Sequence, residues 1–550
     1  MTTTEMTPEV RTIASESPVV PVTALAGPRV PPRRVYDVVP RDGVFALLAF
    51  GIGYVWWDWL WPRSTMIVVQ DGLTGGHAWF QDWLPAAGVP AFFALALAVS
   101  IAYYHLSGVR LTLKAYAGAS AILLATVPFV LYSPTPFHVL LGAALIGAFL
   151  AWHALVFGAP TREVLGVALL TDGLNQSLAP FRNAGAWWAG LTRGLRGRRG
   201  PTQAVAIVVG LILAVPVLAG VVTLLASADD GFSHLVASVT DALAHLNLGR
   251  AFWEALFAIP VAMFAAGLLY ANTRRTGTDT LTPGTLRRAV SAVRHVPAAA
   301  VVAPLAILCL LYVVFFAAMG TYAFSAFAGR LPDGFTYASF ARRGFFELAG
   351  VAALNAAVVA FVHLLVARAL PRVVRVLSAT LCALTLLLVT TSISKMVLYV
   401  GTYGLTLLRL VTLVAMGGLF VVVALVLARH VRRFDVSRPI LAVIIAGLLA
   451  LTWGNPQGFI ARWNVDAFLD GRTSHVDVDY LRDNLGDAAI PALADLARAD
   501  GVDRVAAAQA SAALADYRTS AAAIATAGGA PWMAWNWQRD HAVRVAEAAG

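Results

Sequence analysis

The chain has 550 residues, of which 59% are hydrophobic and only 13% are charged, whereas about a quarter of the residues in a typical soluble domain are charged. Its apolar residues come in blocks of about twenty, the length of a helix that crosses a membrane, and this pattern excludes an ordinary soluble protein. The formal net charge of +10 does not indicate a nucleic-acid partner, because the basic residues lie in short segments between the apolar blocks.

Residues 1–42 precede the first apolar block and are rich in Thr, Pro, Val and Arg. They contain no short apolar core followed by a small-residue cleavage site, which a secretory signal peptide would need. A segment of this composition cannot bury enough apolar surface to fold. We therefore expect a disordered tail at the N-terminus.

Hydropathy read in windows of about nineteen residues predicts eleven membrane-spanning helices. They are expected at Gly43–Pro62, Ala87–His105, Ala115–Tyr132, Phe137–Phe157, Gln203–Ala226, Ala251–Ala271, Ala298–Gly320, Phe345–Ala367, Val376–Tyr399, Leu405–Ala428 and Pro439–Trp453. The segment Leu165–Leu178 is too short and too polar to cross, and we expect an interfacial or loop helix there.

The predicted fold class is all-α: a polytopic transmembrane helical bundle of about eleven spans with a small C-terminal extramembrane helical region. The expected divisions are a tail at 1–42, an N-terminal membrane region at 43–297, a second membrane region at 298–454 and an extramembrane helical tail at 455–550. No whole-chain repeat is visible, so an inverted-repeat transporter has no direct support from the sequence.

Arg and Lys alternate between the predicted loops in a way that indicates an orientation. Basic residues in short loops resist translocation, and with a cytoplasmic N-terminus the tail and inner loops hold 25 basic residues against seven at the outer ends. An odd number of spans then places everything after Trp453 outside. We therefore expect a multi-pass protein of a bacterial cell membrane, with a cytoplasmic N-terminus and an extracytoplasmic tail.

The segment after the last span begins with Asn455-Pro456, which is typical of a turn. Phe459, Ile460 and Trp463 follow at helical spacing, which predicts a helix that lies in the membrane interface. Arg462 and Asn464 would lie on the wetter side of that helix, where we consider them candidates for ligand contact.

The rest of the tail is rich in Ala, Asp and Arg, and we predict a packed helical subdomain from about Val478 onward. Ile490, Leu493 and Leu496 recur every three or four residues, which gives one helix face to pack. Three tryptophans near the C-terminus either lie at the headgroup interface or fill the seam between tail helices, and we favour the seam: Trp532, Trp535 and Trp537.

A first candidate site is the outer run Tyr337–Leu348, which holds Arg342, Arg343 and Glu347. It places two arginines on the side where positive charge is normally avoided. Arg343 and Glu347 are four residues apart, which allows a helical ion pair. The alternative use is an anion or lipid-headgroup site built from the arginine forks.

A second candidate is the run Ser394–Arg409, which joins two spans almost without a polar loop. Lys395 and Tyr399 share a helical face, Gly401 and Gly404 can open the helix, and Arg409 begins the next span, with Tyr403 between. One interpretation is a broken helix whose cations bind a ligand. The other is a tight outer hairpin whose cations reach the interface, and both remain open.

Together these stretches resemble a family of bacterial polytopic membrane proteins known only as a domain of unknown function. The matching runs are Arg342 to Leu348, Tyr403 to Thr406 with Arg409, and Asn455 to Asn464. The resemblance covers about Ala298 to Leu496, and it implies a membrane bundle without implying a reaction.

Standard catalytic signatures are missing: the sequence has no phosphate-binding loop, no His-Glu-x-x-His and no Gly-x-Ser-x-Gly. The histidines are scattered, and Cys309 and Cys382 both lie inside apolar blocks, so we predict no metal, no disulfide and no cofactor. These absences favour a protein that is not an enzyme.

Three functions remain as hypotheses. The first is a membrane protein whose outer face binds an anionic lipid, an envelope component or a protein partner. The second is a transporter of a small solute, although the spans carry few ionisable residues near the midplane. The third is a transferase acting on lipid-linked substrates, for which Glu347 beside Arg342 and Arg343 is the one arrangement that could serve.

Overall fold

The computed structural model describes most of the chain, and its compact unit runs from Val38 to Gly550. The described residues are 36–60, 86–157, 167–196, 248–278, 280, 281, 284, 288, 291, 296–324, 337–366, 371–432, 434–499, 503–526 and 532–549. Within these ranges every regular element is a helix, and Val296 and Val366 form an isolated bridge. The predicted all-α class is confirmed.

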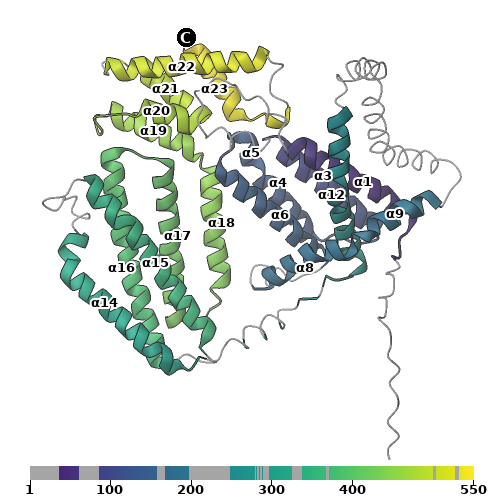
Figure 1. The fold of residues 1–550 in the computed structure, drawn as a ribbon, viewed down its shortest axis with the longest axis horizontal. Helices are drawn as coiled ribbons and strands as arrows, with labels where there is room; N and C mark the ends of the chain where they lie inside the picture. The colour runs from purple at the N-terminus through teal and green to yellow at the C-terminus, as the bar shows by residue number, and fades with distance from the viewer. Residues whose placement is uncertain are drawn as a thin grey trace, which may run out of the picture. The chain divides into compact units, whose positions relative to one another are not determined.

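The helices follow one another along the chain as Figure 1 shows by colour. In the first half they are α1 (Pro40–Leu60), α3 (Gly88–Leu106), α4 (Leu113–Ala125), α5 (Val127–Leu131), α6 (Pro136–Val156), α8 (Val167–Asn183), α9 (Gly185–Arg196) and α12 (Leu248–Arg274). The second half holds α14 (Ala298–Phe324), α15 (Tyr337–Leu365), α16 (Arg372–Tyr403), α17 (Leu407–Val431), α18 (Ser437–Trp453), α19 (Pro456–Leu469), α20 (Val478–Leu485), η3 (Gly486–Ala489), α21 (Ile490–Arg498), α22 (Arg504–Thr526), η4 (Trp532–Ala534) and α23 (Trp537–Ala548).

Nine helical segments in the described ranges are long and apolar enough to cross a membrane. They lie where the sequence predicts spans, while the predicted span Gln203–Ala226 lies outside the described residues. The last predicted span corresponds to α18, which has 17 residues and is therefore about 26 Å long, less than a hydrocarbon core of roughly 30 Å. It reaches the length of a span only together with α19, from which a bend of 64° separates it.

Small residues bring α1 and α12 together. Ala49 and Ala262 are fully buried, and Gly53 approaches so closely that a Cβ there would lie 2.3 Å from the carbonyl oxygen of Ala258. Lipid provides no hydrophobic force between helices, so close backbone approach and the dispersion contacts it allows hold such pairs together. The Gly-Ala pattern within these two apolar blocks therefore has a packing role.

Helices α14 to α17 enclose a separate core, which contains both cysteines. Cys309 and Cys382 are buried and free, as small apolar residues of a membrane interior. A hydrogen-bonded chain crosses this core: the Tyr312 hydroxyl donates to Asn355 Oδ1 (2.8 Å), and Asn355 Nδ2 donates to Thr385 Oγ1 (3.0 Å). Buried polar groups in a membrane need such partners. The two hydrogen bonds therefore fix how α14, α15 and α16 align.

Helix α8 carries its apolar side outward. Leu174, Leu178 and Phe181 are 52%, 40% and 70% exposed, whereas the Gln176 and Asn272 amides are buried and exchange two hydrogen bonds of 2.9 and 2.8 Å. A helix with this pattern turns its apolar face to lipid and its polar face to the neighbouring helix. It contains the described part of the segment predicted as an interfacial or loop helix, from Val167 to Leu178, and continues to Asn183.

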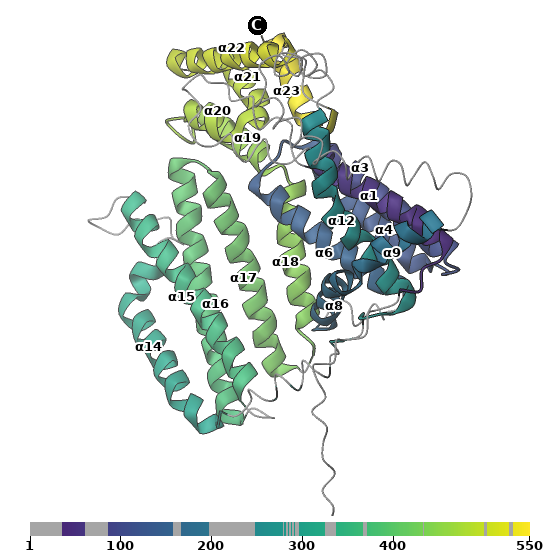
Figure 2. The same cartoon turned by 45° about the vertical axis from the view of Figure 1, so that its right-hand side comes forward.

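Helices α19 to α23 form a helical unit, drawn in yellow-green and yellow in Figures 1 and 2. Its core holds Ile460 of α19, Leu481 of α20, Leu493 of α21 and Leu514 of α22, each at most 2% exposed. The same cluster continues into apolar residues of α16 and α17. The unit therefore packs directly on the ends of membrane helices.

Three contacts define what we call the tail end of the bundle. Trp59 of α1 packs edge-on against Trp532 with 5.1 Å between ring centroids, the Ser133 amide donates to Gln538 (2.9 Å), and the Leu405 amide donates to Asn464 (2.7 Å). The sequence predicts that the end of α1, the α5–α6 turn and the α16–α17 turn lie on the same side of the membrane. In the structure all three contact the helical unit α19 to α23. We call the opposite end of α15 to α18 the basic end, since the arginines of the α17–α18 connection lie there.

Two expectations for the tail are wrong. Trp532, Trp535 and Trp537 are 52%, 47% and 45% exposed, so they do not fill a seam between tail helices. Ala542 and Ala546, both fully buried, pack in that seam instead, because small side chains let the helices approach.

The predicted interfacial helix is also placed differently. Ile460 is fully buried in the core of the unit, whereas Phe459 beside it is 48% exposed. The packed region therefore begins at Pro456, well before Val478, because the apolar face of α19 meets α21 and its own neighbours rather than lipid.

Candidate functional site

The α16–α17 turn is a tight hairpin. Helix α16 runs without interruption through Gly401 and ends at Tyr403, and Gly404 follows with φ +78°. The Thr406 side chain then caps α17 by accepting from the Arg409 amide. The backbone is thus that of a hairpin and not of a broken helix, and Gly404 is needed for its left-handed φ whereas Gly401 does not open the helix.

Asn464 clamps this hairpin to α19. Its Oδ1 accepts from the Leu405 amide (2.7 Å), and its Nδ2 donates to the Leu405 carbonyl (2.7 Å). A side-chain amide that bonds both the N–H and the C=O of one residue satisfies the two backbone groups of that residue. Asn464 is therefore engaged by the fold through both Oδ1 and Nδ2.

Tyr480 of α20 fixes the other side of the turn. Its hydroxyl oxygen accepts from the Leu407 amide at 2.8 Å, one of the first amides of α17 that has no partner within its own helix. Burial raises the pKa of Tyr480, so this oxygen belongs to a neutral phenol. Sequence reasoning missed this residue, because nothing near Tyr480 in the chain points to a partner 73 positions away.

Arg409 lies over the turn. Its guanidinium carbon is 4.3 Å from the centre of the Tyr399 ring, and Nη1 donates to the carbonyls of Tyr403 (2.9 Å) and Gly404. Tyr399 and Tyr403 in turn pack with 5.1 Å between ring centroids. This arrangement orients the guanidinium through Nη1. Among the described residues no hydrogen bond engages its Nε and Nη2 edge, the one that binds oxyanions bidentately.

Lys395 lies one helical turn before Tyr399 and is only 3% exposed. It interacts electrostatically with Glu347 of α15, whose side chain is exposed. The structure thus brings Lys395, Tyr399, Tyr403 and Arg409 together, and we call these four residues the hairpin cluster. Glu347 lies beside it.

The other predicted site residues stand apart from this cluster or outside the description. Arg462 is exposed on α19. Arg342 and Arg343 belong to the first turns of α15, whose helical backbone places them close before Glu347 along the chain, and their side chains lie outside the described residues.

A second polar constellation lies at Asp487, which the sequence did not single out. Its carboxylate accepts from the Ser133 hydroxyl (2.5 Å), the Tyr517 hydroxyl (2.8 Å) and Arg539 Nε (3.1 Å), and the side chain is 13% exposed. Burial and the adjacent carboxylate raise the pKa of Tyr517 well above its ordinary value, so it remains a donor. We call this the Asp487 hub, and it ties α22, α23 and the α5–α6 turn together.

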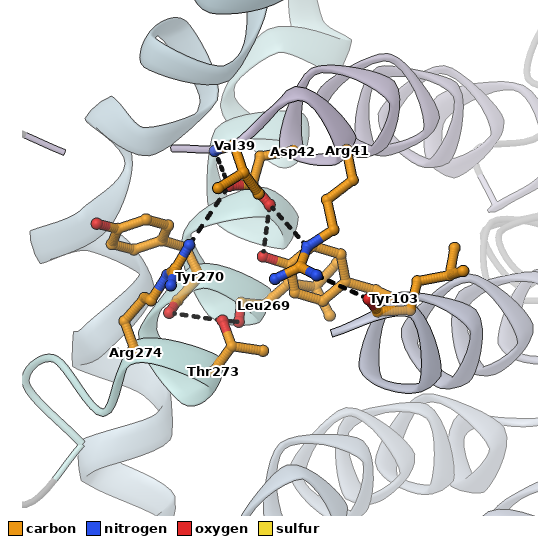
Figure 3. Close-up of polar contacts among 9 residues, drawn as sticks. Val39, Arg41, Asp42, Tyr103, Leu269, Tyr270, Thr273 and Arg274 are labelled. Atoms are coloured by element: carbon orange, nitrogen blue, oxygen red, sulfur yellow. Dashed lines mark hydrogen bonds and ion pairs between the residues drawn. The ribbon is translucent and has the colours of Figure 1, made fainter. Parts of the chain in front are cut away.

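Figure 3 shows a third polar cluster, around Asp42 at the start of α1. The Asp42 carboxylate is buried, accepts from the Tyr103 hydroxyl (3.1 Å) and the Val39 amide (2.8 Å), and lies 4.0 Å from Arg274. A carboxylate near the first turn of a helix satisfies its amides and its positive dipole end. The cluster joins α1, α3 and α12, which is a structural role.

Comparison with known proteins gives one match. Residues 118–496 match the model of a family described as "Domain of unknown function (DUF4153)". That range begins well before Ala298, where the sequence resemblance was expected to start. No curated protein and no solved structure matches the chain.

Proposed function

The chain belongs to the DUF4153 family of unknown function, whose model covers residues 118–496, and within that frame we propose that this integral membrane protein binds an anionic lipid headgroup at its tail end, through the hairpin cluster. The protein partner or envelope component expected as an alternative ligand would use the same surface. In this proposal the tail end faces outward and the N-terminus lies in the cytoplasm, as the distribution of basic residues predicts.

The observation that carries the proposal is the oriented guanidinium of Arg409. Two backbone carbonyls hold Nη1 and the Tyr399 ring lies 4.3 Å from the guanidinium carbon, so little side-chain entropy is lost when the remaining edge binds a phosphate. Cation–π contact with a tyrosine also keeps an arginine partly desolvated without a counter-ion. Such a preset fork suits a phosphodiester at the headgroup level.

The surroundings support an anionic ligand. Lys395 adds a second cation, which is 3% exposed and interacts with Glu347, and charge interactions at such a buried position are screened less than at the surface. Tyr403 is 49% exposed at the end of α16, and exposed aromatic residues are typical of the membrane interface. The half-exposed Trp532, Trp535 and Trp537 belong to the same tail-end unit and fit that depth.

The test is retention of lipid by the purified full-length protein. The protein is reconstituted in nanodiscs with equal amounts of phosphatidylglycerol and phosphatidylcholine, and bound lipid is counted by native mass spectrometry. We expect selective retention of phosphatidylglycerol, and about a 10- to 100-fold weaker retention in Arg409→Gln, because a charge-assisted hydrogen bond contributes about 1.5–3 kcal/mol.

The matched control is Arg432→Gln, which removes the same charge from an exposed arginine at the basic end. Arg409→Lys keeps the positive charge but loses the paired N–H donors of the guanidinium. It should therefore retain phosphatidylglycerol more selectively than Arg409→Gln but less selectively than the wild type. Unchanged selectivity in Arg409→Gln, with a wild-type melting temperature, would exclude the hairpin cluster as the headgroup site.

A further inference from the structure

A cavity of about 370 Å³ lies between α15, α16, α17 and α18, nearer their basic end. Most of its wall is aliphatic, with Val359, Val422, Val426 and Ile440 among the lining residues. Its volume lies at the lower end of the roughly 300–1,000 Å³ found for small-molecule sites, and sites between bundle helices with few polar groups are common.

The polar groups of this cavity lie at two levels. Asn355 and Thr385 line its deep part, and His363 and Arg429 line the other part. Asn355 and His363 are eight residues apart on α15, so the two levels are separated by about 12 Å. Asn355 is already satisfied by Tyr312 and Thr385, so the deep level does not require a polar ligand.

The shallow level carries the imidazole of His363, and His430, which is not itself a lining residue, packs against it. His363 Nδ1 lies 2.8 Å from the Val359 carbonyl and His430 Nδ1 lies 2.7 Å from the Val426 carbonyl. A carbonyl can only accept, so each Nδ1 carries a hydrogen, and Nε2 is the ring nitrogen left for another partner. The two rings are in contact at 5.0 Å between centroids, and His430 Nε2 is buried with no hydrogen-bond partner in the described part of the chain.

Arg429 supplies a positive charge beside these rings and is exposed to the mouth of the cavity. Asp435 is within electrostatic reach of Arg429, but its Oδ1 accepts from the Ser437 amide (3.0 Å) and hydroxyl (2.7 Å) at the start of α18. The carboxylate is therefore engaged with the helix start, and the cavity mouth combines the Arg429 guanidinium with the His363 imidazole.

We propose that this cavity binds a single-chain acidic amphiphile, with its acid group at His363 and Arg429 and its alkyl chain along the aliphatic wall toward Asn355. An acid group suits both partners, since its carboxylate form accepts from the guanidinium, and the proton it gives up can be held by the imidazole Nε2, which then donates to the carboxylate. The volume holds one chain rather than the two of a phospholipid. This site is separate from the hairpin cluster, and the two proposals fail independently.

The experiment uses the full-length protein in detergent, with dodecanoate as the probe and 1-dodecanol as the chain-matched compound without an acid. Native mass spectrometry should show a one-to-one dodecanoate complex. Val422→Phe fills the cavity from α17 and should abolish this complex, whereas Val421→Phe makes the same change on the neighbouring residue, which does not line the cavity, and should leave it unchanged.

Arg429→Gln tests the acid group. It should weaken dodecanoate binding at least about tenfold and leave any 1-dodecanol binding unaltered, and Arg432→Gln serves as the charge-matched control. If Val422→Phe lowers the melting temperature, Ala360→Leu, at an exposed lining position, replaces it. Equal dodecanoate binding by all variants, or equal loss in Val421→Phe and Val422→Phe, would overturn the proposal.

Discussion

Removing the Asp487 carboxylate should loosen α22 and α23 and their contact with the α5–α6 turn. In Asp487→Ala the Tyr517 hydroxyl loses its acceptor, the Ser133 hydroxyl keeps only the longer bond to Asn536 Oδ1 (3.3 Å), and the ion pair with Arg539, which is 32% exposed, is lost. Leaving a buried donor unsatisfied costs about 1–3 kcal/mol, and breaking a buried ion pair costs about 3–5 kcal/mol. Since Arg539 keeps some access to water, which screens the charge, we expect a total near 3 kcal/mol.

The assay is limited trypsin digestion of the full-length protein carrying a C-terminal epitope, under conditions in which opening is fast relative to cleavage. The cleavage rate then follows the population of the open form, so a loss of about 3 kcal/mol should accelerate release of the epitope about a hundredfold. The rise should be smaller in Asp487→Asn, which keeps one acceptor oxygen.

Asp483→Ala is the matched control. Asp483 lies four residues earlier, is 56% exposed and pairs with Arg482 at 2.7 Å. An exposed pair contributes about 0–1 kcal/mol, so cleavage should rise at most about fivefold. If Asp483→Ala accelerates cleavage as much as Asp487→Ala, or if Asp487→Ala behaves like wild type, the hub does not hold the tail.

Three further predictions follow from the same structure. Gly404→Ala should lower the stability of the α16–α17 hairpin by about 1–3 kcal/mol, because φ at this position is +78° and a Cβ would lie 2.8 Å from Asn464 Oδ1. Gly401 has open space around it, so Gly401→Ala should be neutral or stabilising in the same thermal melt. In intact cells an impermeant thiol reagent should not modify a cysteine introduced at position 197 or 288 but should modify one at exposed Trp537, and labelling at either of the first two would reverse the proposed topology. Hydrogen bonds from Ser437 lower the pKa of Asp435. The contribution of this carboxylate to stability is therefore present above the unfolded pKa of about 3.9 and is lost as the pH falls through the lower folded value. Asp435→Asn should reduce the fall of the melting temperature in this acid range, and an unaltered fall would contradict the assignment.

Much of the candidate site could be named from the sequence, but not its use. Lys395, Tyr399, Tyr403 and Arg409 lie within fifteen residues of one another in the chain, and helical spacing together with the glycine after Tyr403 indicates that they meet. Asn464 was expected to contact a ligand, and the structure shows a second use of its side chain, because Oδ1 and Nδ2 both bind Leu405. A sequence motif shows that an amide is needed at that position but does not show what the amide binds.

The sequence by itself determined the membrane class and the positions of the spans, because a hydrocarbon core of roughly 30 Å imposes the same length and the same lack of charge on every crossing segment. These are local properties, and each can be read from about twenty consecutive residues. The turn at Asn455-Pro456 was equally local, and the positive φ of Asn455 at 45° is what starts α19 at an angle to α18.

Only the tertiary structure decided how the tail is held and where a ligand cavity lies. The partners of Asp487 are 30, 52 and 354 positions away in the chain, and the polar groups of the cavity come from three different helices. Hydrogen bonds and cavities depend on atoms within a few ångströms of one another, and no periodicity along the chain records which distant segments meet.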